Sequence, residues 1–217
     1  EAKVDSGPSE VVESLPEVKR ELSLNEILQE VANVAMGRAA DLLARLLNVF
    51  VKLPVPKVVE VEYGDLLMML ADANREENIS AVCQGFIGYG IAGEALLLYT
   101  DSSLADMAKI MRYTEEGPVD NEVELLIDTA NVLIGACLAG IAQQLDIQFS
   151  QGHPRLLGKH VQVTELLKKK PDWRKTLAIE IHYEIEGHNV ACDLILLFTE
   201  DSLPQLQTRA SYLSEAS

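Results

Sequence analysis

Two stretches of this 217-residue sequence decide its fold because they are near copies of each other: ALLLYTDSSL at residues 95–104 and LILLFTEDSL at residues 194–203. They align residue by residue at an offset of 99 (194 − 95). A second pair, NVAMG at residues 33–37 and NVLIG at residues 131–135, repeats at an offset of 98 (131 − 33). Two separate stretches with nearly the same offset indicate an internal duplication.

The same order of predicted elements runs through both halves of the chain. Helical or alternating apolar spacing, bounded by capping residues, glycines and prolines, predicts each of them. In the first half these are a long helix over residues 24–50, a strand over 58–63, a short helix over 65–72, strands over 79–87 and 92–100, and a helix capped by Asp101 that runs to residue 113. In the second half they are a long helix over 122–145, a strand over 147–150, a short helix over 164–170, strands over 176–185 and 190–199, and a final helix capped by Asp201.

The duplication predicts an α/β (α+β) fold in a single domain, residues 22–213. We expect repeat one, residues 22–113, and repeat two, residues 120–213, to be related by a pseudo-two-fold axis. They would share one antiparallel or mixed sheet with the two long helices on one face. Residues 1–21 are acidic and contain two prolines, so we expect a flexible tail or the remnant of a linker.

The composition limits the classes of function. The formal net charge of −16 opposes binding to nucleic acid or to anionic membranes, which both require clustered Lys and Arg. No apolar run approaches the ~20 residues of a membrane span and no signal peptide is visible, so we expect a cytoplasmic protein. Cys83, Cys137 and Cys192 lie far apart among apolar residues, which predicts buried, reduced thiols. No Cys/His spacing indicates a metal site, and we expect no cofactor on this chain.

Each long helix carries a narrow polar strip. At about 100° per residue, positions i, i+4, i+7 and i+11 fall within an arc of roughly 60°. These positions are Glu26, Glu30, Asn33 and Gly37 in the first helix, and Glu124, Asp128, Asn131 and Gly135 in the second. Acidic residues alone are typical of a solvated helix face, but a mid-helix glycine costs roughly 1 kcal/mol relative to alanine. The repeated Asn and Gly therefore predict a docking surface, because a glycine lets another surface approach closely.

The sets Glu30-x-x-Asn33-x-x-x-Gly37 and Asp128-x-x-Asn131-x-x-x-Gly135 resemble the paired motifs of the CheC/CheX/FliY phosphatases of bacterial chemotaxis. The resemblance covers roughly residues 22–205 and implies a CheC-like domain. It implies four catalytic residues: Glu30, Asn33, Asp128 and Asn131. The sequence departs from the family pattern where Glu26 and Glu124 replace an Asp or Ser, and where Asp128 replaces the usual Glu. The first motif therefore matches more completely than the second.

The resemblance also implies an activity and its partners. The substrate would be a phosphorylated response regulator of the CheY type, which brings its own Mg²⁺ and lysine. Asn33 would position the attacking water through its carboxamide, and Glu30 would pair with the partner's lysine. A CheD-like deamidase is a further partner that the resemblance suggests.

A different class of function stays open beside this one. Flagellar motor switch proteins resemble this chain in its duplicated fold but lack the Glu/Asn motif. The chain could therefore be a non-catalytic interaction module that binds a response regulator or acts like a flagellar switch protein. Asn33 and Asn131 argue against that alternative, because such a module has no use for them.

Two further motifs carry less weight. GYGIAG at residues 88–93 matches GxGxxG, but it runs into a strand rather than a helix, so glycines in the turn of a β-hairpin explain it better than a nucleotide site. The four histidines do not cluster at the spacing of metal ligands, and we expect each to be structural or exposed. They are His153, His160, His182 and His188.

Overall fold

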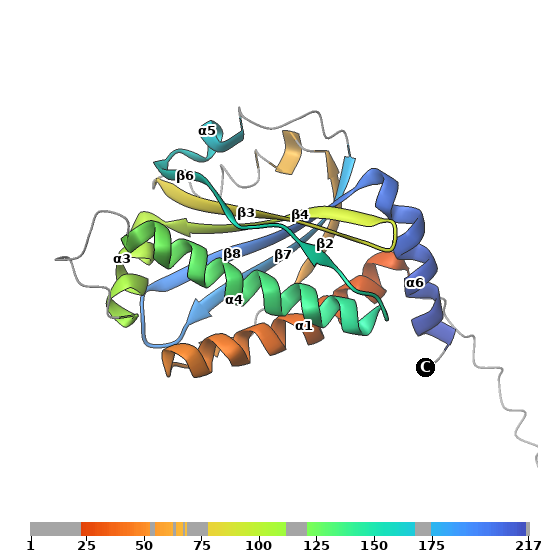
Figure 1. The fold of residues 1–217 in the computed structure, drawn as a ribbon, viewed down its shortest axis with the longest axis horizontal. Helices are drawn as coiled ribbons and strands as arrows, with labels where there is room; N and C mark the ends of the chain where they lie inside the picture. The colour runs from red at the N-terminus through yellow and green to blue at the C-terminus, as the bar shows by residue number, and fades with distance from the viewer. Residues whose placement is uncertain are drawn as a thin grey trace, which may run out of the picture.

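The computed structural model describes residues 23–52, 55–62, 64–66, 68, 78–111, 121–167 and 175–215. The predicted tail, most of the predicted helix over 65–72 and the end of the predicted helix over 164–170 lie outside these residues. The described elements are α1 (Leu24–Leu47), β1 (Val51–Lys52), β2 (Lys57–Glu62), β3 (Ile79–Gly88), β4 (Ile91–Thr100), α3 (Asp101–Ile110), α4 (Asn121–Gln144), β5 (Ser150–Gln151), β6 (Arg155–Val161), α5 (Val163–Leu167), β7 (Lys175–Ile185), β8 (Val190–Thr199), a 3₁₀ turn (Glu200–Ser202) and α6 (Leu203–Glu215). Figure 1 shows α1 and α4 below the sheet, with α3 and α6 at its opposite ends.

One antiparallel sheet joins the two repeats. Its strand order is β1-β7-β8-β4-β3-β5, with β2 also pairing with β7 and β6 with β3. At its centre Leu96 of β4 lies opposite Ile195 of β8, and these two residues are equivalent in the repeat (96 + 99 = 195). The pseudo-two-fold axis therefore passes between them, and the predicted fold class is confirmed. Each outer strand pairs with the hairpin of the other repeat, so neither repeat completes its own sheet.

Two buried serines also connect the two repeats, each through a hydrogen bond from the backbone of the other repeat. The backbone N–H of Ala92 donates to Ser202 Oγ at 2.8 Å, and the N–H of Ala191 donates to Ser103 Oγ at 3.1 Å. The two bonds are equivalent at the offset of 99 (92 + 99 = 191; 103 + 99 = 202). Each hydroxyl thus satisfies a backbone donor of the other repeat, which otherwise would be left unpaired in the protein interior.

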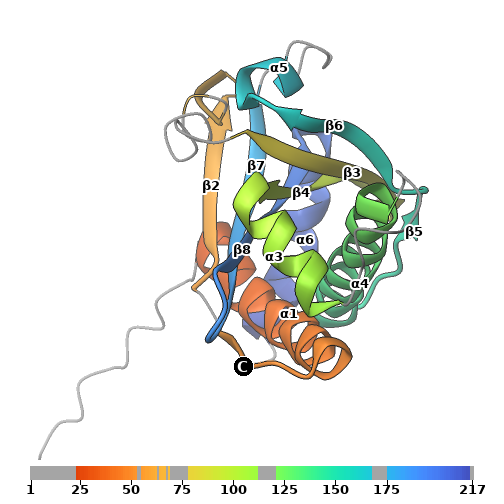
Figure 2. The same ribbon diagram turned by 90° about the vertical axis from the view of Figure 1, so that its left-hand side faces the viewer.

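Both faces of the central strands are buried, which explains their unbroken apolar runs. On one face, residues such as Leu97 and Leu194 pack against α1 and α4 in the larger core. On the other face, Leu96 and Ile195 belong to a second core that also contains Leu166 of α5. Figure 2 shows β6 and α5 curling over this second face.

The two long helices pack against each other in antiparallel directions. Gly140 of α4 lies so close to α1 that an added Cβ would sit 2.7 Å from Ala35 Cα. One turn further along each helix, Arg38 Nη1 donates a hydrogen bond to Gln143 Oε1. Further toward the end of α1, Leu46 shares a groove with Val132, which precedes Gly140 on α4. The residue numbers of the partners on α4 therefore fall as those on α1 rise, and the first turns of the two helices lie at opposite ends (Figure 1).

The backbone conformation just beyond the C-terminal end is the same for both long helices, as the duplication predicts. Ser23 caps α1 in a capping box, since its Oγ accepts from Glu26 N at 3.3 Å and its N–H donates to Glu26 Oε2 at 2.8 Å. At the other end Asn48 has φ 52°, and its repeat equivalent Asp146 (48 + 98 = 146) has φ 53°. A left-handed residue thus follows within two positions of the end of each helix, and Asn and Asp tolerate this conformation better than most side chains.

Several predicted details were wrong. Thr100, not Asp101, caps α3 through its side chain, which accepts from Ser103 N at 3.3 Å. Asp201 does not cap α6; it lies within a 3₁₀ turn that precedes that helix. Of the strand predicted over 147–150 only Ser150 lies in a strand, the two-residue β5, and β6 was not predicted.

The expectation that no segment has the apolarity of a membrane span was wrong for one helix. Residues Glu122–Gln144 are long and apolar enough by length and composition, with a mean hydropathy of 1.9. This helix packs inside the fold, however, and 61% of its apolar 18-residue stretch is buried. Its apolarity follows from its position in the larger core against the sheet and α1.

The predicted hairpins and thiols are confirmed. Tyr89 and Gly90 turn β3 into β4 with φ values of 54° and 76°, as a two-residue turn with both central φ angles positive requires. This turn accounts for the GxGxxG spacing. The three cysteines are buried and none of them forms a disulfide.

Candidate functional site

The polar strip of α1 faces water. Glu30 and Asn33 are exposed, while Val31 and Ala35 on the opposite side of the helix are buried in the larger core. Within the part of the chain that the structure describes, neither Glu30 nor Asn33 makes a side-chain hydrogen bond or ion pair. Both polar groups are thus available to another molecule.

The strip of α4 is presented in the same way. Asp128 and Asn131 are exposed, while Leu133 and Ile134 are fully buried beneath them. The Asn131 side chain has no hydrogen-bond partner among the described residues. Because α1 and α4 are antiparallel, the two carboxamides lie toward opposite ends of the helix pair rather than in one composite site.

The glycine of each strip is not required by packing within the chain. A Cβ added at Gly37 would meet no atom within 4 Å, and one added at Gly135 would meet only Gln151 Oε1 at 3.9 Å. The contrast with Gly140, whose Cβ would collide with the backbone of α1, shows what an internal packing requirement looks like. Since a mid-helix glycine costs roughly 1 kcal/mol, both strips carry a cost that the fold itself does not explain.

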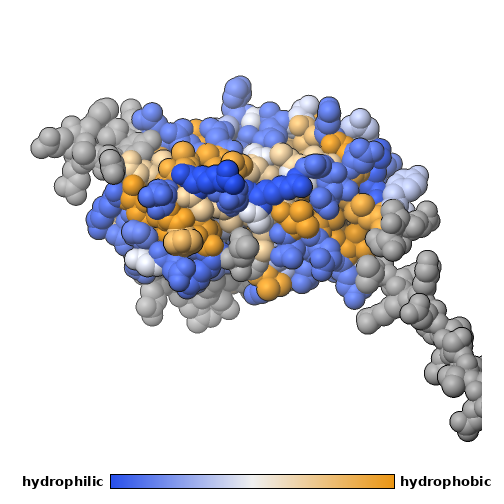
Figure 3. All heavy atoms as spheres, turned by 90° about the horizontal axis from the view of Figure 1, so that it is seen from below, coloured by the Kyte–Doolittle hydropathy of each residue, from blue (hydrophilic) through white to orange (hydrophobic). Residues whose placement is uncertain are grey.

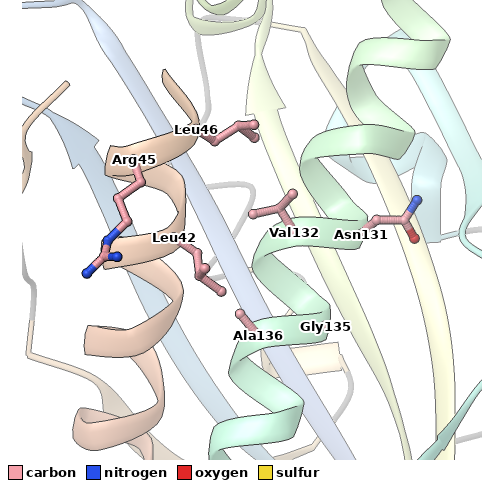
Figure 4. A pocket seen from close by; sticks show the side chains of 7 residues that line it. All are labelled: Leu42, Arg45, Leu46, Asn131, Val132, Gly135 and Ala136. Carbon is pink, nitrogen blue, oxygen red and sulfur yellow. The ribbon is translucent and has the colours of Figure 1, made fainter. Parts of the chain in front are cut away.

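An apolar groove runs beside the α4 strip. It has a volume of about 630 Å³ and is lined by Leu42, Arg45 and Leu46 of α1 and by Asn131, Val132, Gly135 and Ala136 of α4. Figure 4 shows Leu42 and Leu46 pointing toward Val132 and Ala136, while Asn131 points to the other flank of α4. Figure 3 shows apolar patches among hydrophilic side chains on the face that the two helices form.

The corresponding positions beside the α1 strip are more polar, although Val132 has an apolar equivalent in Val34, which is 41% exposed. At the offset of 98, Leu46 is replaced by Gln144 (46 + 98) and Ala136 by Arg38 (136 − 98). Arg38 bonds across the helix pair to Gln143 there. The two strips therefore share their motif but not their surroundings.

A charged cluster fixes the start of α4 to β6. His160 Nδ1 lies 2.8 Å from Asp101 Oδ1, its Nε2 lies 3.2 Å from Glu122 Oε2, and Lys159 Nζ lies 2.5 Å from Glu122 Oε2. The hydrogen bond with Asp101 and that with Glu122 raise the pKa of His160, although partial burial opposes the shift. The hydrogen bond from Lys159 lowers the pKa of Glu122.

Other chemistry finds little support in this part of the molecule. Burial raises the pKa of both Cys137 and Cys192 to about 12, so these two thiols are not poised as nucleophiles. Within the described ranges, no group of three or more His, Cys, Asp or Glu side chains could hold a metal ion. His182 instead pairs with Asp193 at 2.6 Å across β7 and β8.

The sequence did not single out the residues that distinguish the two strips. Leu42 and Leu46 belong to the other long helix, and their approach to Asn131 depends on the antiparallel packing of α1 and α4. In the sequence these two leucines can be recognised only as apolar residues on a helix face that is expected to be solvated, and only when the two repeats are aligned.

Comparisons with known proteins agree with this architecture. Neither protein-family models nor curated proteins match the sequence. Among solved structures, FliY from Thermotoga maritima is similar with a TM-score of 0.65 at 17% identity, covering 88% of this chain and 96% of that one. A FliM middle domain from H. pylori has a TM-score of 0.58 at 11% identity, covering 86% and 97%. A CheC-like protein from Shewanella sp. PV-4 has a TM-score of 0.54 at 12% identity, covering 78% and 97%.

These likenesses establish the fold. The chain has the fold of the CheC/CheX/FliY chemotaxis proteins, which the FliM middle domain shares. The predicted resemblance is confirmed at that level.

Proposed function

We propose that this chain is a cytoplasmic phosphatase that hydrolyses the aspartyl phosphate of a CheY-type response regulator in chemotaxis or two-component signalling. The observation that carries the proposal is the doubled strip, in which an exposed Asn stands one turn before a glycine that no internal contact requires. A fold common to chemotaxis proteins supports it.

The chemistry asks mainly for orientation. A water molecule attacks phosphorus, the bond between phosphorus and the aspartyl oxygen breaks, and inorganic phosphate and a free carboxylate are released. The regulator is expected to bring the Mg²⁺ that neutralises the phosphoryl oxygens. This chain would supply the carboxamide of Asn33 or Asn131, whose oxygen accepts a hydrogen bond from the water and holds it in line.

The acidic residue one turn earlier would set the docking register. Glu30 and Asp128 lie three residues before Asn33 and Asn131, on the same exposed strip. A carboxylate there would pair with the lysine of the regulator's phosphorylation site. Asp128 is one methylene shorter than Glu30, so the partner would need to approach α4 more closely than α1.

The alternative is a non-catalytic module that binds a response regulator or a flagellar switch component. The FliM middle domains, which share the fold, favour it. The two functions differ in one observable, since a binding module would form a complex without speeding the release of phosphate.

The test is the decay of a CheY-type receiver domain phosphorylated with acetyl phosphate. We expect the wild-type chain to accelerate decay. Asn33→Ala and Asn131→Ala should each remove the acceleration contributed by one site, and the double variant should reduce the acceleration roughly 100-fold. Acceleration that survives intact in the double variant would refute the roles of both residues. A complex without acceleration would favour the binding module.

A further inference from the structure

The geometry points to two unequal sites: the α4 site carries an apolar docking groove for an apolar side chain of the response regulator, beside its phosphoaspartate, whereas beside the α1 strip the polar residues Gln144 and Arg38 replace two of the groove's apolar residues. This inference rests on the proposed function and specifies how its partner is recognised. The other repeat contributes Leu42, Arg45 and Leu46 of α1 to the lining of this groove.

Exposure of these leucines is the first argument. Leu42 and Leu46 remain 50% and 56% exposed, although they stand one turn apart on the same face of α1. Exposed apolar side chains that are grouped around a hollow mark interaction sites more often than those scattered singly. The two leucines line a hollow of about 630 Å³ that opens to solvent.

Continuity with the α4 strip identifies the occupant. Around the helix axis at about 100° per residue, Gly135 lies roughly 40° from Asn131, and Val132 and Ala136 follow at about 100° and 140°. The glycine therefore stands between the carboxamide and the groove wall, where any larger side chain would raise a ridge. A single partner surface can then contact Asn131 and the groove together, which makes the regulator bound at Asn131 the occupant.

Beside the α1 strip, Val34 is the apolar equivalent of Val132, but two other apolar residues of the groove are replaced by polar ones. Leu46 corresponds to Gln144 and Ala136 to Arg38, and Arg38 already bonds to Gln143 across the helix pair. The regulator would carry an apolar side chain beside its phosphoaspartate. At the α4 site that side chain would be buried against Leu46, and at the α1 site it would meet the Arg38 and Gln143 side chains. We expect the α4 site to bind the regulator more tightly, although its motif departs further from the family pattern.

The experiment removes one site at a time and then alters the groove. Leu42→Gln and Leu46→Gln are combined in an Asn33→Ala background, where only the α4 site works, and in an Asn131→Ala background, where only the α1 site works. The substrate is a CheY-type receiver domain phosphorylated with acetyl phosphate. In the first background the two leucine substitutions should raise KM roughly tenfold without changing kcat, because about half of each leucine side chain would lose its apolar contact with the regulator. In the second background KM should stay unchanged.

The control is Ile87→Thr, which changes an equally exposed apolar residue on the sheet face opposite to α1 and α4. Equal effects of the leucine pair in both backgrounds, or none in either, would overturn the inference while leaving the phosphatase in place. Absence of hydrolysis by the wild type would instead overturn the proposed function. Affinity for the beryllofluoride-activated receiver domain then still tests the groove, and a leucine pair that leaves this affinity unchanged would overturn it.

A second copy of this chain is the competing occupant. Sedimentation of the wild type and the leucine pair distinguishes it. A concentration-dependent dimer that the leucine pair abolishes would contradict the assignment of the groove to the regulator.

Discussion

At the scale of single residues, each strip combines an exposed asparagine with a glycine that costs helix stability and that no internal contact requires. Asn33 and Asn131 are exposed and unpaired among the described residues, and Gly37 and Gly135 face open space. The sequence predicted this much, because helical spacing determines which residues share a face. It did not predict that no internal atom needs the glycines, since that depends on tertiary packing.

The glycines give a prediction with opposite effects on stability and function. Gly37→Ala and Gly135→Ala should each raise the free energy of unfolding by about 1 kcal/mol, because alanine is the better helix former and meets no crowding. The same changes should weaken dephosphorylation of the regulator, because they add bulk where the partner approaches. Urea unfolding and the decay assay measure the two effects. A loss of stability, or unchanged dephosphorylation, would contradict the account.

His160 predicts a pH dependence of stability. Its raised pKa means that the charged imidazolium is favoured in the folded state by Asp101 and Glu122. The stabilisation should be complete below the ordinary histidine pKa of 6.5 and should fade as the pH rises through the raised value. Glu122, whose pKa is lowered, contributes above 4.5 and loses its contribution as the pH falls through its lowered value.

The variant His160→Asn measures this contribution. Asn tolerates the positive φ of 55° at this position, so the backbone should be preserved. In urea unfolding from pH 6 to 9, the stability difference between wild type and variant should shrink as the pH rises. His188→Asn, in the turn between β7 and β8, is the control. A difference that stays constant with pH would contradict the role of the imidazolium.

At the scale of elements, local patterns predicted what local physics determines. The long helices, both hairpins and the order of elements follow from periodicity and capping. The strand β6 escaped because RLLGKHV does not alternate: Leu156 and Leu157 are adjacent, the pairing with β3 carries register shifts, and His160 adopts a positive φ. Its pairing with a strand of the other repeat is a long-range contact that no sequence window contains.

The crossing of α1 and α4 yields a prediction that distinguishes packing from function on one helix. Gly140→Ala places a Cβ against the Cα and Cβ of Ala35, at 2.7 and 2.8 Å, so the helices must move apart. We expect a loss of roughly 1–3 kcal/mol, the usual cost of overpacking. The matched Gly135→Ala variant, five residues earlier on α4, should be stabilised instead. Thermal unfolding compares the two, and equal effects would contradict the helix crossing.

At the scale of the whole molecule, the duplication produces two sites at opposite ends of one helix pair and then makes them unequal. The strand exchange and the paired Ser103 and Ser202 bonds tie the repeats into one sheet. The sequence predicted the symmetry and the better match of the first motif. It could not predict the groove beside Asn131, because that groove forms only where residues of α1 meet α4 of the other repeat.

The most direct measurement follows one preparation of the Asn33→Ala/Asn131→Ala double variant through two readouts. Its affinity for the beryllofluoride-activated receiver domain should stay within about threefold of wild type, because the acidic residues and the groove remain. Its acceleration of phosphate release should fall by roughly 100-fold, because no carboxamide is left to position the water. Phosphate release at the wild-type rate by this variant would contradict the account.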